Sequence, residues 1–304
     1  MRATSYVTCL GLALLIGASG SCDSHPRSPG PVLVPPPPSL AAPLTRAPSA
    51  PIPGATGEGK TGFRAVVFPS VNPRHEAWRE GWERGAERRF WEKLAKVLNQ
   101  IFKLPRVVEI QVKNCPTPNL YFDPNTKTVV ICYEFFDYLF ELFDGVPQAD
   151  FAGIDAWRKV LGTIFFAFYH ELGHALIDVL EIPVLGKEED AADQLAAYLT
   201  LLAIKDLQDL SWVALSAADW FKLQGALNKR AGQPPPYWDA HSLSLQRYYH
   251  VLCLVYGSAP NKFIKLLGPS GLPQHQARRC VSEAKNVKRA WSKVLAPHMG
   301  VKLP

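Results

Sequence analysis

Hydrophobic and polar positions follow two different periods along this chain. Apolar runs of strand length, bounded by turn residues, predict strands within residues 63–68, 106–112 and 121–132. Apolar residues at helical spacing predict helices over residues 74–103, 133–143 and 155–181, and through most of the chain beyond residue 202, with a glycine and proline break at 232–236. The pattern therefore predicts an α+β fold with a small mixed or antiparallel sheet and a mostly helical C-terminal half.

The helix predicted over residues 155–181 carries chemistry at its centre. From Phe165 to Ile177 its apolar run is interrupted by charge only at His170, Glu171 and His174. Side chains four residues apart share a helix face, so the two imidazoles are neighbours, as in the H-E-x-x-H pattern of zinc sites. Glu171 is the expected base for a metal-activated water. Burying these three side chains is costly unless something binds them, although buried helices do contain satisfied histidines.

A third metal ligand is expected from the segment that follows. A proline and a glycine end the first helix, and a second helix is predicted to start at the acidic run Glu188-Glu189-Asp190. A catalytic zinc site takes three protein ligands and leaves one position open for water. Any of these three carboxylates could supply that ligand, and Asp193 could orient a ligand histidine through its other ring nitrogen. Alternatively, the acidic run only complements the helix dipole.

The residues HELGH followed by EEDAAD resemble the gluzincin pattern H-E-x-x-H … E-x-x-x-D of thermolysin-like zinc peptidases. The longer stretch HELGHALIDVLEIPVLGKEEDAADQ is similar to a bacterial putative metallopeptidase family described as a domain of unknown function. The resemblance implies a zincin-like fold and one Zn²⁺ per chain. It makes His170, His174 and Glu189 the metal ligands. It also makes Glu171 the catalytic base and Asp193 the residue that orients a ligand.

Two comparisons limit what the resemblance implies. The gap from His174 to Glu189 is shorter than in thermolysin, so the specificity subsites of that enzyme are not carried over. The metzincin pattern is excluded, because it requires glycine and histidine where this chain has Ile177 and Leu180.

The segment from Tyr237 to Cys253 also resembles the family, whose members carry His-Ser-Leu … Gln-Arg just before a cysteine. Gluzincin peptidases need a donor for the oxyanion of the tetrahedral intermediate. The resemblance makes His241 the first candidate for this catalytic role and Arg247 the second. The alternative is a helix start capped by Asp239 or Ser242.

Two further positions are expected to border the site. In zincin folds a strand near the active-site helix can pair with an extended substrate, and by this analogy Thr128 to Cys132 is the expected strand. Gly173 lies inside the active-site helix, where glycine is about 1 kcal/mol less favourable than alanine. A close approach of backbone, from the sheet or from the substrate, would explain this glycine.

Composition excludes some classes of partner. The formal net charge of +6 is mild for 304 residues, and no block of Lys and Arg is interleaved with aromatic residues. A nucleic-acid partner is therefore not expected. With 47% hydrophobic residues the chain can bury a sizeable core.

The N-terminal residues have the organisation of an exported bacterial protein. Residues 1–21 have the positive start, apolar centre and small-residue end of a signal peptide. The small residues before Cys22 resemble a lipoprotein processing site, which would attach the chain to a membrane by lipid alone. Residues 22–62, rich in proline, predict a disordered tether, and residues 63–304 a zinc metallopeptidase-like domain.

An even number of cysteines in the exported chain, all able to form disulfides, is consistent with export. If Cys9 leaves with the signal peptide and Cys22 carries lipid, four cysteines remain, which allow three connectivities. Cys115 and Cys132 flank the predicted hairpin, and their disulfide would contribute roughly 3 kcal/mol. Cys253 and Cys280 lie near each other in the chain and form the second expected pair.

These observations predict a zinc-dependent peptidase that acts on a peptide or protein substrate in the periplasm or at the cell surface. Two rival classes stay open. One is a zinc-dependent hydrolase or amidase acting on a non-protein cell-wall substrate. The other is a non-enzymatic zinc-binding lipoprotein, which would have no use for the base Glu171.

Overall fold

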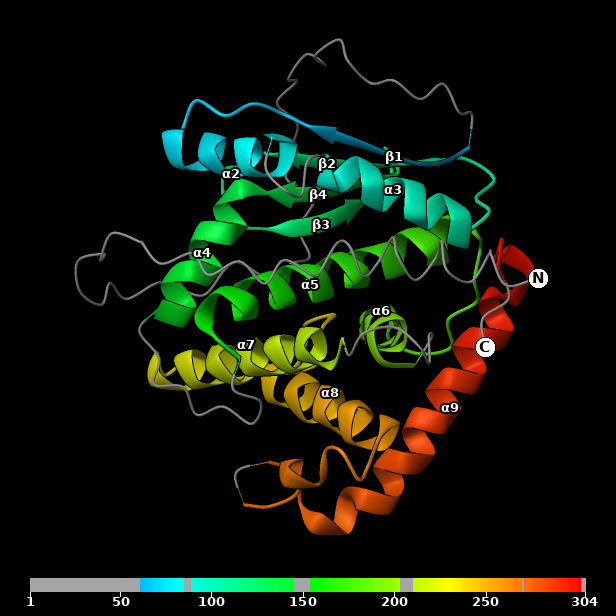
Figure 1. Ribbon diagram of the computed structural model, residues 1–304. Helices are drawn as coiled ribbons and strands as arrows, with labels where there is room; N and C mark the ends of the chain where they lie inside the picture. The colour runs from blue at the N-terminus through cyan, green and yellow to red at the C-terminus, as the bar shows by residue number, and fades with distance from the viewer. Residues whose placement is uncertain (1–60, 85–88, 145–153, 203–209, 270, 302–304) are drawn as a thin grey trace.

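Figure 1 shows the protein as a computed structural model that describes residues 61–84, 89–144, 154–202, 210–269 and 271–301. The predicted signal peptide (1–21), the lipidation site at Cys22 and almost all of the predicted tether (22–62) lie outside the described residues. The first described strand begins at Gly62, one residue before the predicted start of the folded domain.

The strands of the described residues form one mixed sheet in the order β1-β2-β4-β3. Their bounds are β1 Gly62–Val67, β2 Val107–Lys113, β3 Leu120–Asp123 and β4 Thr128–Cys132. The first, second and fourth strands run parallel, and β3 pairs antiparallel with β4 as the predicted hairpin. In the hairpin turn the Asp123 carboxylate accepts the Asn125 N–H at 2.9 Å, and Lys127 has the left-handed φ of 54°.

The prediction that Thr128–Cys132 pairs with substrate is wrong. β4 is bonded to β2 on one side and to β3 on the other, and all five of its side chains are buried. The edge of the sheet beside β4 belongs to β3, and β3 packs against the helix that carries the histidine pair. Any extended chain that joins the sheet at this side must therefore pair with β3.

Helices α3, α4 and α5 pack against this sheet, and the chain after it is mostly helical. The predicted α+β class and the mostly helical C-terminal half are therefore confirmed. The bounds of the helices are α2 Pro73–Arg84, α3 Phe90–Ile101, α4 Tyr133–Asp144, α5 Ala156–Val179, α6 Glu188–Ala197, α7 Ser211–Arg230, α8 Ser244–Ser258 and α9 Ala277–Leu295. The prediction of a single helix over residues 74–103 is wrong. Arg89 has the left-handed φ of 59° and cannot continue a right-handed helix, so α3 starts after it.

The long helix α5 is the centre of the fold. Figure 1 shows the sheet and α3 on one side of it, α6 and α7 on the other, and α8 and α9 beyond them. Its N-terminus is capped by the Asp155 carboxylate, which accepts the Arg158 N–H. By length and hydropathy α5 could cross a membrane, but 83% of its apolar window is buried inside the protein. It is therefore packed as a core helix.

Gly173 lets α6 approach α5 closely. A Cβ atom at this position would lie 3.0 Å from the Ala192 Cα and 3.2 Å from the Ala192 Cβ. The close approach predicted from this glycine is present, and it is made by α6. Since α6 carries the acidic run, Gly173 controls how near those carboxylates lie to the histidines of α5.

The variant Gly173→Ala is expected to be less stable than the wild type by about 1–3 kcal/mol, because the new methyl group overpacks against the α6 backbone. Gly81→Ala is the matched control, since a Cβ there meets nothing within 4 Å in α2. That control should gain about 1 kcal/mol from helix propensity. Urea unfolding measures both, and a Gly173→Ala protein as stable as its control would contradict the close packing.

Both predicted disulfides are present among the described residues. Cys115 is bonded to Cys132 and Cys253 to Cys280. The first joins the end of β4 to the segment after β2, and the second joins α8 to α9. They are compatible with an extracellular location.

Candidate metal centre

The histidine pair of α5 faces the first turns of α6. His170 and His174 lie one helical turn apart, with their Nε2 atoms 3.2 Å from each other and their ring planes at 78°. His170 is buried, with 2% of its surface exposed, and His174 is partly exposed. Both Nε2 atoms therefore point to the same small region between the two helices.

Glu189 completes a triangle of donor atoms with the two histidines. Its Oε2 lies 3.0 Å from the His170 Nε2 and 3.3 Å from the His174 Nε2. Ligand atoms bound at about 2.0–2.1 Å to a tetrahedral metal ion lie about 3.3 Å from one another. The three atoms therefore have the mutual spacing of one face of a metal coordination sphere.

The neighbouring acidic residues make different contacts. Glu188 places its Oε1 2.8 Å from the Nδ1 of His174, the ring nitrogen on the other side from the triangle. Asp190 accepts a hydrogen bond of 2.7 Å from the Ser242 hydroxyl. Of the three acidic residues considered as ligands, Glu189 is the one that the structure brings to both Nε2 atoms.

Asp193 and Arg247 fix the orientation of His170. The Asp193 Oδ1 lies 2.8 Å from the His170 Nδ1, and an ionised carboxylate can only accept, so Nδ1 carries the hydrogen. Arg247 donates two hydrogen bonds of 2.7 Å to Asp193 and stacks at 4.0 Å over the ring of Phe221. Burial opposes ionisation of Asp193, but the Arg247 charge lowers the pKa of this carboxyl well below its ordinary value. The Nε2 of His170 is thus directed toward the triangle.

Arg247 was the second candidate for the oxyanion donor, and the structure places it elsewhere. Its guanidinium is buried against Asp193, with two donors engaged there. Sequence reasoning missed this pairing because the two residues are separated by 54 positions and no local pattern links them.

The charges of the cluster depend on one another. Burial raises the pKa of Glu189, but hydrogen bonds with His170, His174 and His241 outweigh it and lower this pKa strongly. Burial lowers the pKa of His170, yet hydrogen bonds to Asp193 and Glu189 raise it to about 9. A metal cation at the triangle would replace a proton as the positive partner of Glu189.

Glu171 lies beside the triangle without belonging to it. Its Oε1 is 4.0 Å from the His170 Nε2, and its Oε2 accepts the backbone N–H of Phe122 at 2.9 Å. Phe122 belongs to the edge strand β3, so the sheet edge and the carboxylate are in direct contact. Burial raises the pKa of Glu171, against the lowering effect of the two histidines. A carboxylate in this place can exchange a proton with a group held near the two histidines.

His241 reaches the cluster from the segment before α8. Its Nε2 lies 2.8 Å from the Glu189 Oε2, and its ring is nearly parallel to that of His170 at 6.0 Å. Asp239 accepts from the His241 backbone N–H at 2.8 Å and lies 3.2 Å from its Nδ1. The helix-cap alternative is wrong, because α8 starts at Ser244 with Leu243 as its N-cap. Asp239 was missed as a partner of His241, although its position two residues earlier is a usable signal.

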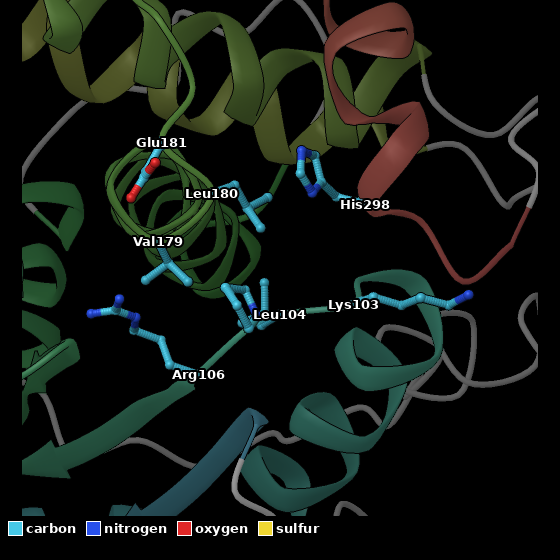
Figure 2. Close-up of a pocket in the computed structure, with 8 residues that line it drawn as sticks. Lys103, Leu104, Arg106, Val179, Leu180, Glu181 and His298 are labelled. Carbon is cyan, nitrogen blue, oxygen red and sulfur yellow. The ribbon is translucent and has the colours of Figure 1, made fainter.

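A cavity of about 500 Å³ lies at the C-terminal end of α5, away from this cluster. Figure 2 shows Val179, Leu180 and Leu104 in its apolar part, with Arg106 and His298 nearby. Its lining residues include no member of the triangle and neither Glu171 nor Phe122. The candidate centre is therefore the polar cluster between α5, α6 and the segment before α8.

The donor set fits a metal. Two imidazole nitrogens and a carboxylate oxygen converge, and groups of His170 with Glu189 and His241, or with Glu171 and His174, have donor atoms within 4.8 Å of one another. Cys115 and Cys132 also lie near a carboxylate, but they are joined in a disulfide and offer no thiolate.

Comparison with known proteins agrees with a metal. The family model described as "Putative metallopeptidase" matches residues 71–295, which is more than half of the chain and includes α5, α6 and α8. No curated protein and no solved structure matches.

Proposed function

This chain belongs to the putative metallopeptidase family, and from that membership we propose that it is a zinc-dependent peptidase with His170, His174 and Glu189 as ligands. The observation that carries the proposal is the triangle of two Nε2 atoms and one Oε2 atom, with sides of 3.0, 3.2 and 3.3 Å. The three atoms come from two helices that meet at Gly173, so the triangle depends on the packing of α5 against α6 as well as on the H-E-x-x-H spacing.

The donor set favours zinc over the hard cations. Calcium and magnesium prefer oxygen ligands, whereas two imidazoles and a carboxylate form a usual three-ligand set for catalytic zinc. Three protein ligands leave a position for water or for the substrate carbonyl. Zn²⁺ bound here would acidify a water and polarise the carbonyl group of the scissile peptide.

Residues around the triangle would then carry out the proton transfers of peptide hydrolysis. Glu171 accepts a proton from the water as its oxygen bonds to the carbonyl carbon, and passes that proton to the amine nitrogen as the C–N bond breaks. The Nε2 of His241 lies against the Glu189 Oε2, and a metal held by that oxygen would free Nε2 to donate to the carbonyl oxygen as negative charge develops there, with Asp239 holding the ring at Nδ1. Asp193 and Arg247 keep His170 in the ligand orientation.

The substrate would lie along the edge strand β3. Phe122 directs its N–H away from β4, toward Glu171. An extended peptide that pairs with β3 would therefore pass directly beside the base. We place this activity outside the cytoplasm, with export by residues 1–21, attachment by a lipid on Cys22 and a tether up to residue 62. The disulfides Cys115–Cys132 and Cys253–Cys280 support that location.

Hydrolysis of a denatured protein by the purified, zinc-supplied chain tests the proposal. New amino termini should appear, stop when a chelator removes the metal, and return when zinc is added back. If the zinc-loaded chain leaves proteins intact but cleaves a cell-wall amide, the peptidase proposal is contradicted and the amidase alternative is supported. Zinc binding with neither reaction would favour the non-enzymatic lipoprotein.

A further inference from the structure

Two adjacent aromatic side chains project into solvent just before the residues of the metal centre. Tyr237 is 77% exposed and Trp238 is 81% exposed. Aromatic rings of this size are usually covered in a folded protein, and exposed ones mark binding surfaces more often than other residues do. Asp239, the partner of His241, is the next residue, so the aromatic pair lies at the border of the candidate centre.

The segment that carries the pair is bonded to the N-terminal turn of α6. The Lys187 ammonium donates to the Asp239 carbonyl at 3.2 Å and to the His241 carbonyl at 3.5 Å, and the Ser242 hydroxyl donates to Asp190 at 2.7 Å. The residues 234–236 that precede the pair are all proline, which fixes φ and limits the motion of the chain. The backbone that carries the two rings is therefore held beside the first turn of α6, the helix that carries Glu189.

A third exposed apolar side chain lies in the loop between α5 and α6. Leu185 is fully exposed and lies two residues before Lys187, the residue that contacts the aromatic segment. The loop between α5 and α6 and the segment before α8 thus each present exposed apolar side chains, and Lys187 bonds the two segments to each other. The aromatic pair is linked to the cluster along the chain, because the next residue is Asp239, which holds His241 beside Glu189.

We propose that Tyr237 and Trp238, with Leu185 beside them, form a subsite for a large apolar or aromatic side chain of the peptide substrate, close to the scissile bond. The inference rests on the proposed function and names its substrate class. A peptide is favoured over a glycan because Glu171 lies against the edge strand β3 at Phe122, and an extended peptide backbone can pair with an edge strand. The aromatic faces would contact the substrate side chain while the backbone pairs with β3.

Binding to the zinc-loaded Glu171→Gln protein tests the subsite without turnover. The probes are fluorescent peptides of one length in which a phenylalanine or a serine occupies each position in turn. At one position phenylalanine should bind about tenfold tighter than serine. Adding Trp238→Ala should remove that preference and Trp238→Phe should retain most of it. Ile264→Ala, at an exposed residue after α8, is the control and should leave it unchanged.

Equal binding of all peptides, or a phenylalanine preference that survives both Trp238→Ala and Tyr237→Ala, would overturn the subsite. Displacement of the peptides by a cell-wall glycan fragment would also overturn it, since the rings would then stack on sugars. The proposed function is tested separately, by measuring peptide hydrolysis by the wild-type protein. If the protein binds these peptides selectively but never cleaves them, the result would support the subsite and contradict the proposed peptidase activity.

Discussion

The Glu171→Gln variant is expected to bind metal as the wild type does and to lose peptide hydrolysis by a factor of about 10²–10⁴. Glutamine has nearly the same shape, and its side-chain oxygen can still accept the Phe122 N–H at the edge of β3. The amide cannot take up a proton. Because Glu171 lies outside the triangle of ligand atoms, removing its charge should leave the metal ligands in place.

Initial rates on one peptide and metal content on the same preparation measure the two effects. Glu181→Gln is the matched control, since it makes the same chemical change just after α5 and does not touch the cluster. The control should keep full activity. A Glu171→Gln enzyme with wild-type rates would show that another group performs the proton transfer.

The Arg247→Met variant is expected to lose about 3–5 kcal/mol of unfolding free energy. Arg247 and Asp193 are both buried, and the methionine would leave the Asp193 carboxylate without its cationic partner. His170 would then lose a fixed acceptor at Nδ1, so metal affinity should fall by about 10–100-fold. Denaturant unfolding of the metal-free protein measures the first effect, and competition with a chelator measures the second.

Two further variants separate orientation of the ligand from general loss of stability. Arg247→Lys keeps the charge but not the paired hydrogen bonds, and it should retain part of both properties. Arg289→Met removes an exposed arginine of α9 and should change stability by less than about 0.5 kcal/mol. If Arg247→Met is as stable as Arg289→Met and binds metal as tightly as the wild type, the role given to Arg247 is wrong.

Features that depend on short stretches of chain could be predicted from the sequence. The spacing of His170 and His174 places them on one helix face, and Glu189 and Asp193 repeat the same spacing on α6. The hairpin followed from turn residues between two β-prone runs. These regularities come from the helix and strand periods, which act over a few residues.

Features that depend on how distant elements pack could not be predicted in the same way. The order of the strands places β3, and not β4, at the edge, and all five side chains of β4 are buried. The contact of Phe122 with Glu171 joins residues 49 positions apart. Such contacts follow from tertiary packing, which leaves no periodic pattern in the chain.

Zinc content of the purified chain, measured by elemental mass spectrometry after dialysis, tests the metal centre most directly. The wild type should retain about one zinc per chain, and Glu189→Ala should lose most of it, because the triangle loses one of its three ligand atoms. Asp190→Ala, which removes the adjacent carboxylate bonded to Ser242, should retain the metal. A wild type that binds no zinc, or a Glu189→Ala protein that binds it as the wild type does, would contradict the centre described here.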